Sequence, residues 1–257
     1  MDVNYHYTIN IIDKIKNFCD KLIVYSTSEL WNDYEGEVSI NMPFKYNYSP
    51  YIKSKEVLSN HINYHKHEYN NVKIIYPFNF NSPYRKNGFL FSKIFDSIIN
   101  KNKNTIGDIS FTRDLIHPSI IANQSIITNE DLLIGGGELI DVKKFVENLF
   151  RMSKIEFSEY ITVNENNGLK NIRKNYFSKI AYSNYNDLLN LTYYFIYQSK
   201  SNVEIYSKIM KLYRKIILPL KKIQNIKLNK DKNRKIKIAF LDNCIVQNHS
   251  VAKDRVG

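Results

Sequence analysis

The sequence predicts an α/β fold built around a parallel β-sheet. Two short, continuous apolar runs, Leu22–Tyr25 and Val72–Tyr76, have the composition of strands that are buried on both faces. After a loop, each run is followed by a segment with helical spacing, and this alternation is typical of parallel sheets. At 257 residues, with 43% hydrophobic and 24% charged residues, the chain is long enough for one domain with a sizeable core and an appendage.

The first predicted element is a helix over residues 3–19, because Ile9, Ile12, Ile15 and Phe18 recur at helical spacing. Pro50 is placed where a second helix starts, and this helix runs from Tyr51 to about Tyr69. A strand at 72–76, ended by Pro77, is followed by helices at 89–100 and from 118, a strand at 132–134 and a helix at 141–152. Residues 153–185 are predicted to be irregular. Beyond them, the sequence predicts a helix over 186–218 and a strand at 235–241.

Tyr51 and Lys55 carry the first chemical signal, because residues four apart on a helix share one face. A nearby cation favours a phenolate, and it lowers a tyrosine pKa from about 10 toward the range of an acid/base catalyst. The hydroxyl run Ser26–Ser28 lies some twenty residues upstream and could hold a substrate oxygen against the phenol. Taken alone, the pair also fits two exposed residues on a surface helix.

Four segments resemble, in the same order, the extended short-chain dehydrogenases/reductases of the NAD-dependent nucleotide-sugar epimerase and dehydratase branch. Val3–Ile12 is similar to the family's helix with an asparagine and a Gly-Thr pair, and Lys21–Trp31 is similar to the strand that ends at the catalytic hydroxyl. Ile74–Arg85 is similar to the next strand and its Arg-x-Phe-Asn-x-x-Gly-Pro loop. Thr105–Asp108 with Arg113–His117 is similar to the substrate-side segment that contains Arg-Asp-Phe-Ile-Tyr. This resemblance covers residues 2–150. It implies a Rossmann-like, doubly wound parallel sheet with a small substrate-binding lobe.

The resemblance also assigns catalytic roles. Tyr51 becomes the general acid/base, Lys55 its pKa modifier and a ligand of the cofactor ribose, and Thr27, with Ser28 beside it, the group that binds the reacting oxygen of the sugar. Glu29 separates the branches of the family better, because Ser-Thr-Ser-Glu resembles 4,6-dehydratases and related decarboxylases, whereas simple 4-epimerases usually carry no acid there. Elimination after oxidation at C4 needs a base and an acid, and a carboxylate can serve. The alternative for Glu29 is a carboxylate that caps a turn.

Four residues are assigned to binding by the same resemblance. Pro77, at the end of its strand, falls among the cofactor-binding residues. Asn79, Arg85 and Arg113 resemble groups that hold the nucleotide diphosphate, and a guanidinium matches phosphate oxygens in a planar, two-pronged geometry. Arg113 could instead be paired with Asp114. Outside these four, Asn4 matches the asparagine that positions the active-site segment.

The family's Gly-x-x-Gly-x-x-Gly turn, which receives the dinucleotide pyrophosphate, is absent from the sequence. The cluster Gly135–Gly137 follows the catalytic segment and is interpreted as a strand-end turn. The resemblance therefore implies a chain that begins near the end of the family's fourth strand and lacks the N-terminal cofactor half. That half would have to come from a separate chain or an upstream reading frame. Without it, we expect an exposed sheet edge and two bare sheet faces.

The charge is concentrated in one segment. Residues 208–238 contain twelve Lys or Arg against the single acid Asp231, which accounts for +11 of the net +12. A solvated basic helix and linker is the plainer interpretation. RNA, DNA, an anionic membrane surface or an acidic partner are alternatives, although the stripe lacks the interleaved aromatic residues of a single-strand platform.

Other patterns exclude function classes. Cys19 and Cys244 are far apart and give neither a disulfide framework nor zinc spacing. No apolar run has the length of a membrane span and no signal peptide is evident, so we expect a cytoplasmic protein. His61, His65 and His67 lack an accompanying carboxylate pattern, and we expect a solvated helix face rather than a metal site.

Two functions remain open. The first is an enzyme, an NAD- or NADP-dependent nucleotide-sugar 4,6-dehydratase or epimerase, whose sugar is oxidised transiently at C4. The second is a remnant or partner subunit that binds no dinucleotide. In either case residues 1–152 form the partial catalytic and substrate region, and residues 153–257 form a helical, basic extension. The resemblance also implies a homodimer through the helix of Tyr51 and the one at residues 3–19.

Overall fold

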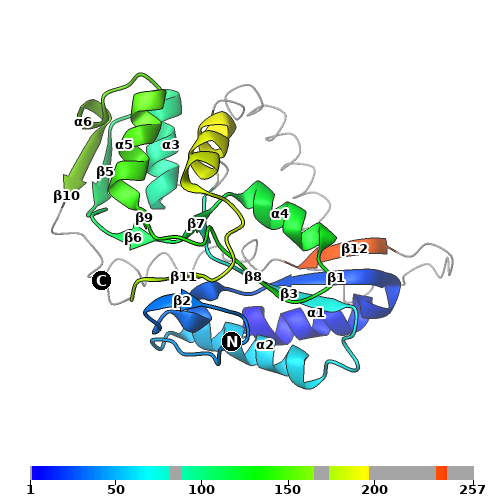
Figure 1. Ribbon diagram of the computed structural model, residues 1–257. Helices are drawn as coiled ribbons and strands as arrows, with labels where there is room; N and C mark the ends of the chain where they lie inside the picture. The colour runs from blue at the N-terminus through cyan, green and yellow to red at the C-terminus, as the bar shows by residue number, and fades with distance from the viewer. Residues whose placement is uncertain (1, 82–87, 165–173, 197–235, 242–257) are drawn as a thin grey trace.

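The structure, a computed structural model, describes residues 2–81, 88–164, 174–196 and 236–241. Its core is a four-stranded parallel sheet in the order β12-β1-β3-β8 (Figure 1). Leu22, Ile23 and Ile74 are fully buried, as expected for strands covered on both faces. The strands predicted from short apolar runs are therefore confirmed: β1 (Cys19–Tyr25), β3 (Val72–Pro77), β8 (Leu132–Ile134) and β12 (Ile236–Leu241).

Helices lie on both faces of this sheet (Figure 1). One face is covered by α1 (Thr8–Ile15), which is continuous with the helical turns η1 (Asp2–Tyr7) and η2 (Lys16–Phe18), and by α2 (Pro50–Tyr64). The other face carries α4 (Pro118–Ile127). Lys21 of β1 joins the sheet to α4, because its Nζ donates to the carbonyls of Ile126 at 2.6 Å and Thr128 at 2.5 Å.

Helices on both faces correct the expectation of two bare sheet faces, and strand β12 covers the edge of β1 and leaves its own outer edge, among the described strands, as the exposed one. The two strands pair in parallel register, from Cys19 opposite Ile236 to Val24 opposite Leu241. A parallel strand exposes backbone N–H and C=O groups along any free edge, and a second strand satisfies them. Here that strand comes from the C-terminal part of the chain. In the part of the chain that the structure describes, no strand pairs with the outer edge of β12.

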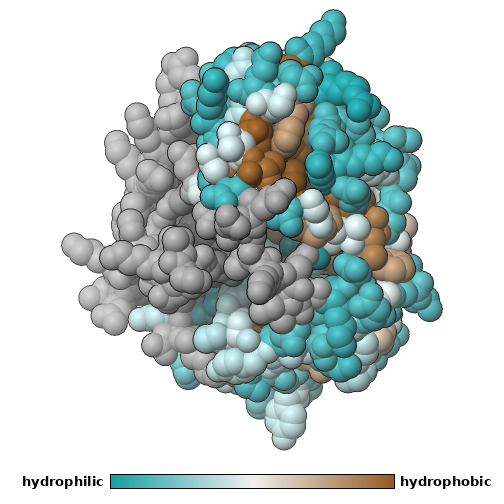
Figure 2. All heavy atoms as spheres, turned by 90° about the vertical axis from the view of Figure 1, so that its left-hand side faces the viewer, coloured by the Kyte–Doolittle hydropathy of each residue, from teal (hydrophilic) through white to brown (hydrophobic). Residues whose placement is uncertain are grey.

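A small lobe lies beside the sheet, at the upper left of Figure 1, and has a hydrophobic core of its own. Its helices α3 and α5 pack through Phe91, Phe95, Phe145 and Leu149. Figure 2 shows a mainly hydrophilic surface on this side, with a hydrophobic patch in its upper half. The elements of the lobe are α3 (Leu90–Asn100), β5 (Asn104–Gly107), α5 (Val142–Met152), α6 (Phe157–Tyr160) and β10 (Ile161–Asn164).

Two- to four-residue ladders connect segments that are distant in sequence. They are β2 (Gly36–Val38) with β11 (Tyr176–Ser178), β4 (Asn79–Phe80) with β7 (Leu115–Ile116), β6 (Thr112–Arg113) with β9 (Ile140–Asp141), and β5 with β10. Within residues 153–164 and 174–185, the parts of the segment 153–185 that the structure describes, there are a helix and two strands where the sequence predicted irregular structure. A two- or three-residue strand is too short to show a period of its own.

Several predictions fall wholly or partly outside the described residues. Arg85 does, as does nearly all of the basic segment 208–238. The predicted helix 186–218 is described over residues 185–196 and is helical there. Within the described ranges, no helix is long and apolar enough to cross a membrane. The division of the chain at residue 152 remains a prediction.

Candidate active site

The predicted catalytic residues converge at the carboxyl end of β1. Thr27, two residues after this strand, is the N-cap of the short helical turn η3 (Ser28–Trp31), and its Oγ1 accepts a hydrogen bond from the Glu29 backbone N–H at 3.2 Å. Thr27, Ser28 and Glu29 are all buried. A threonine hydroxyl is a favoured N-cap, and this cap turns the chain so that the hydroxyls and the carboxylate lie at the strand end.

The carboxylate of Glu29 is not a bare buried charge. Its Oε2 accepts a hydrogen bond from the Asn32 side-chain amide at 3.2 Å. The neighbouring Ser28 Oγ lies 3.5 Å from the Tyr176 hydroxyl, which is brought here by the β2–β11 ladder. Because burying an ionised carboxylate without partners is very costly, the amide contact allows an acid to lie beside the hydroxyl run.

Tyr51 and Lys55 lie on one face of α2, as their spacing predicted. The Lys55 side chain is 3% exposed, and its Nζ donates to the Tyr25 carbonyl at 2.8 Å. The same Nζ lies 6.0 Å from the centroid of the Tyr51 ring. Helix α2 starts at Pro50 after the N-cap Ser49, whose Oγ accepts from the Ile52 N–H at 3.1 Å. This start sets Tyr51 in the first turn and aims Lys55 at the end of β1.

Asn4 secures the start of α2 from the neighbouring helical segment. Its Nδ2 donates to Ser54 Oγ at 3.1 Å, and Ser54 Oγ in turn donates to the Tyr51 carbonyl at 2.6 Å. The Asn4 Oδ1 is buried, and no hydrogen-bond partner for it lies in the described part of the chain. Asn4 therefore reaches the turn that carries Tyr51, which is compatible with the positioning role that the resemblance implied.

The predicted substrate-binding residues lie on two paired segments. Pro77 ends β3, and Asn79 follows in β4, opposite Leu115 of β7. Arg113 lies two residues before Leu115. Its Nη1 donates to the Thr112 carbonyl at 2.6 Å, and its guanidinium lies 4.9 Å from the centroid of the Phe111 ring. The β4–β7 ladder thus brings Asn79 and the Arg113 segment together after the carboxyl end of β3.

Asp114 was considered from the sequence only as a partner for Arg113, and the structure gives it a different environment. Its carboxylate, 1% exposed, accepts from the backbone N–H groups of Gly136 at 2.5 Å, Ser178 at 2.9 Å and Gly137 at 3.2 Å. Burial raises its pKa to about 6, against the opposing effect of these donors. The adjacent Arg-Asp and Gly-Gly-Gly segments were visible in sequence, but their contact was not.

The glycine cluster is the strand-end turn that the sequence predicted, and it closes around Asp114. A Cβ on Gly135 would lie 2.4 Å from the Asp114 Oδ2, and one on Gly136 would lie 2.6 Å from the Leu115 carbonyl oxygen. Gly137 has a φ of +83°, which favours glycine. The backbone N–H groups of Gly136 and Gly137 bind a carboxylate of this chain, so this turn is not a cradle for phosphate.

His61 of α2 and His65 at its C-terminal end form hydrogen bonds to neighbouring side chains. His61 contacts the Tyr5 hydroxyl at 3.0 Å and the Tyr69 hydroxyl at 3.4 Å. Burial, and then the nearby His65, lower the His61 pKa. Over the described ranges, no group of three or more His, Cys, Asp or Glu residues could hold a metal ion.

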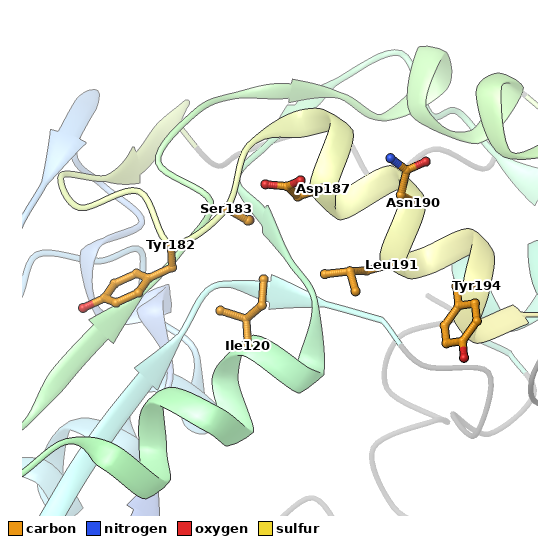
Figure 3. Close-up of a pocket in the computed structure, with 7 residues that line it drawn as sticks. All are labelled: Ile120, Tyr182, Ser183, Asp187, Asn190, Leu191 and Tyr194. Atoms are coloured by element: carbon orange, nitrogen blue, oxygen red, sulfur yellow. The ribbon is translucent and has the colours of Figure 1, made fainter.

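A cavity of about 440 Å³ lies away from these residues, between α4 and the helix at 185–196 (Figure 3). None of the predicted catalytic or substrate residues lines it. Its walls are Ile120 on α4, Tyr182 and Ser183 in the preceding loop, and Asp187, Asn190, Leu191 and Tyr194 on the helix. The cavity is therefore separate from the residues predicted to be catalytic, which lie around the end of β1.

Comparisons with known proteins identify the family and the fold of the chain. The profile of the GDP-mannose 4,6 dehydratase family matches residues 1–190. A search of curated sequences gives no match. Similar solved structures include dTDP-glucose 4,6-dehydratase from Bacillus anthracis str. Ames in complex with NAD, which is 17% identical with a TM-score of 0.61 over 78% of this chain and 69% of that one.

Two further structures share the fold. RMD from Pseudomonas aeruginosa, complexed with NADPH, is 14% identical, with a TM-score of 0.60 over 78% of this chain and 74% of that one. UDP-glucuronic acid 4-epimerase from Bacillus cereus, in complex with NAD, is 20% identical, with a TM-score of 0.59 over 76% and 67%. The fold is therefore that of the Rossmann-type dehydratases and epimerases.

Proposed function

Because the chain belongs to the GDP-mannose 4,6 dehydratase family, we propose that it forms the catalytic and substrate-binding part of an NAD(P)-dependent enzyme acting on a nucleotide sugar. The observation that carries this proposal is the buried Lys55 ammonium, which donates to the last carbonyl of β1 and lies 6.0 Å from the centroid of the Tyr51 ring, while the buried Glu29 lies in the turn that follows β1. A surface pair without function would gain nothing from burying a lysine, because burial penalises its charged form.

The chain's own residues suit transient oxidation of a sugar hydroxyl at C4. The Lys55 ammonium favours the phenolate form of Tyr51, this phenolate takes the proton of the sugar hydroxyl and becomes a phenol, and Thr27 binds the same oxygen. When bound, NAD or NADP would supply the hydride acceptor and return the hydride later. Lys55 would also hold the ribose of that cofactor, while Asn79 and Arg113 would bind the diphosphate of the substrate.

Glu29 favours the 4,6-dehydratase reaction over simple epimerisation. Loss of water across C5 and C6 requires a base for the C5 proton and an acid for the leaving hydroxyl. A buried carboxylate held by an amide, with Ser28 as its neighbour in sequence, provides such a group at the end of β1. An epimerase that only inverts C4 has no step that needs this carboxylate.

The dinucleotide fits only in part. The residues for the nicotinamide side are present, but the sequence has no Gly-x-x-Gly-x-x-Gly turn, and Gly135–Gly137 is used by Asp114. We therefore propose that the pyrophosphate is bound by residues outside this sequence, on another chain or upstream. The alternative, a partner subunit that binds no dinucleotide, is favoured by β12, which occupies the edge of β1 that such residues would extend.

The test is binding and turnover by the full chain. NAD and NADP are titrated by calorimetry, and dTDP-glucose, GDP-mannose and UDP-glucose are then offered with the cofactor that binds. The Tyr51→Phe variant should lose turnover at least about a hundredfold while still binding the cofactor, since proton transfer by a positioned side chain typically contributes that much. The matched control is Tyr64→Phe, on the same helix but 83% exposed, which should behave as wild type.

The outcomes separate the two functions. Micromolar binding of NAD or NADP with turnover supports a stand-alone enzyme and refutes the proposal that the pyrophosphate is bound by residues outside this sequence. A folded chain that binds neither cofactor refutes the stand-alone enzyme and leaves an enzyme completed by such residues or a partner subunit. Equal turnover by wild type and Tyr51→Phe would refute the assignment of Tyr51.

A further inference from the structure

Asn32 connects Glu29 to the segment that leads into the helix of Tyr51. It follows the turn η3 directly, and its side chain is 2% exposed. The amide Nδ2 donates to the Glu29 Oε2 at 3.2 Å, and the amide Oδ1 accepts from the Asn47 backbone N–H at 2.7 Å. One buried side chain thus joins a carboxylate to a loop that is fifteen residues away.

The loop that Asn32 holds leads directly into the helix of Tyr51. Asn47 precedes the N-cap Ser49 by two residues, and Tyr51 lies in the first turn that this cap begins. A second attachment supports the same geometry, because the Lys45 N–H donates to the Leu30 carbonyl at 2.9 Å. A shift of residues 45–49 relative to η3 would therefore move Tyr51 relative to Glu29.

The two partners of Asn32 demand an amide. Glu29 presents an acceptor and Asn47 presents a donor, so the bridge needs one donor and one acceptor on a side chain of this length. Aspartate has the same shape but, when ionised, only accepts hydrogen bonds. Alanine provides neither group, and glutamine is longer by one methylene in a buried position.

We infer that Asn32 is a positioning residue, which fixes the Glu29 carboxylate and the start of the Tyr51 helix in one arrangement. This inference rests on the proposed dehydratase function for its effect on turnover, but the bridge itself can be tested without turnover. Asn32 does not touch the reacting atoms. It holds the group that takes the C5 proton at a set position relative to the group that acts at C4.

Two substitutions separate the two halves of the bridge. Asn32→Asp keeps the acceptor for Asn47 and places a second carboxylate beside Glu29. Asn32→Ala removes both contacts. The control is Asn104→Asp in the small lobe, where the Asn104 Nδ2 donates to Asp96 Oδ2 at 3.0 Å, so that the same change is made beside an acid far from the site.

The first readout is hydrogen exchange of the Asn47 amide in the full chain. Exchange should be at least tenfold faster in Asn32→Ala than in wild type and unchanged in Asn32→Asp, because only alanine removes the acceptor. Equal protection of this amide in all three proteins would overturn the bridge. This measurement decides the point even if the wild-type chain shows no turnover, a result that would count against the proposed function alone.

The second readout is the pH dependence of 4-keto-6-deoxy sugar formation with dTDP-glucose, GDP-mannose or UDP-glucose. At pH 8 the paired carboxylates of Asn32→Asp repel each other, and kcat should fall at least tenfold. Near pH 6 the pair can share one proton, so an O–H again donates to Glu29 and most of the loss should be recovered. Asn32→Ala should lose activity equally at both pH values, and Asn104→Asp should match wild type. A pH-independent loss in Asn32→Asp would overturn the inference.

Discussion

In the His117→Asn variant, the free energy of unfolding should fall as the pH rises from 4 to 6. In the wild-type protein this fall is hidden, because His117 has an opposite effect of similar size. The concealed effect belongs to Asp114, whose pKa is raised from 3.8 to about 6 by burial. The folded state holds this proton where the unfolded chain releases it. The stabilising contribution is therefore complete below pH 3.8 and is lost as the pH rises through about 6.

His117 has the opposite effect. Burial lowers its pKa from 6.5 to about 4, and its buried Nε2 has no hydrogen-bond partner among the residues that the structure describes. The folded state keeps the ring neutral where the unfolded chain protonates it. Its contribution is therefore complete above pH 6.5 and is lost as the pH falls through about 4. At about 1.36 kcal/mol per pKa unit, the pKa shift of each residue changes the free energy of unfolding by about 3 kcal/mol. The two pH dependences have opposite signs and nearly cancel in the wild-type protein.

The assay is urea unfolding followed by circular dichroism at intervals from pH 4 to pH 7.5. Relative to wild type, the unfolding free energy of His117→Asn should fall by about 3 kcal/mol as the pH rises across this range, and that of Asp114→Asn should rise by a similar amount. Asparagine can still cap α4 in place of the His117 ring nitrogen, which accepts from the Ser119 N–H at 3.3 Å.

The comparison uses differences from wild type because other titrating groups contribute equally to all three proteins. A substitution that only weakens packing shifts the whole curve and leaves its slope unchanged. Difference curves that are flat with pH for both variants would refute the reasoning. Slopes of the same sign would refute it as well.

Three further predictions concern the frame around the site. Gly135→Ala should destabilise the fold by about 2–4 kcal/mol, measured by urea unfolding, because its Cβ would overlap the Asp114 carboxylate; an unchanged midpoint would contradict this. Lys21→Met should cost about 1–3 kcal/mol and speed amide exchange at the end of α4, since two charge-assisted bonds to its last carbonyls are lost; unaltered exchange would count against it. A chain ending at residue 235 should unfold at lower urea and lose amide protection in β1, and full protection there would show that β12 is dispensable.

The parts of the site that could be predicted from sequence depend on local geometry. Tyr51 and Lys55 are four residues apart, so a helix of any origin puts them on one face, and Pro50 indicates where that helix begins. Thr27 and Glu29 follow a short apolar run that forms a buried strand in any parallel sheet. The predicted end of the helix at Tyr69 was less accurate. Helix α2 ends at Tyr64, and His65 caps it.

The remaining features depend on pairings between distant segments, which periodicity cannot predict. Strand β12 was expected as an element, but nothing within Ile236–Leu241 indicates that its partner is β1, more than two hundred residues earlier. The partner of the Asp114 carboxylate is equally hard to predict from the sequence. In sequence, its nearest cation is Arg113, which favours an ion pair, whereas packing delivers three backbone N–H groups from β11 and the glycine turn. These donors are fixed by the fold, and a buried carboxylate needs such partners wherever it lies. The same reasoning applies to Asn32, because its inferred role depends on hydrogen bonds to both Glu29 and Asn47. Only the folded chain brings that acceptor and that donor within reach of one amide.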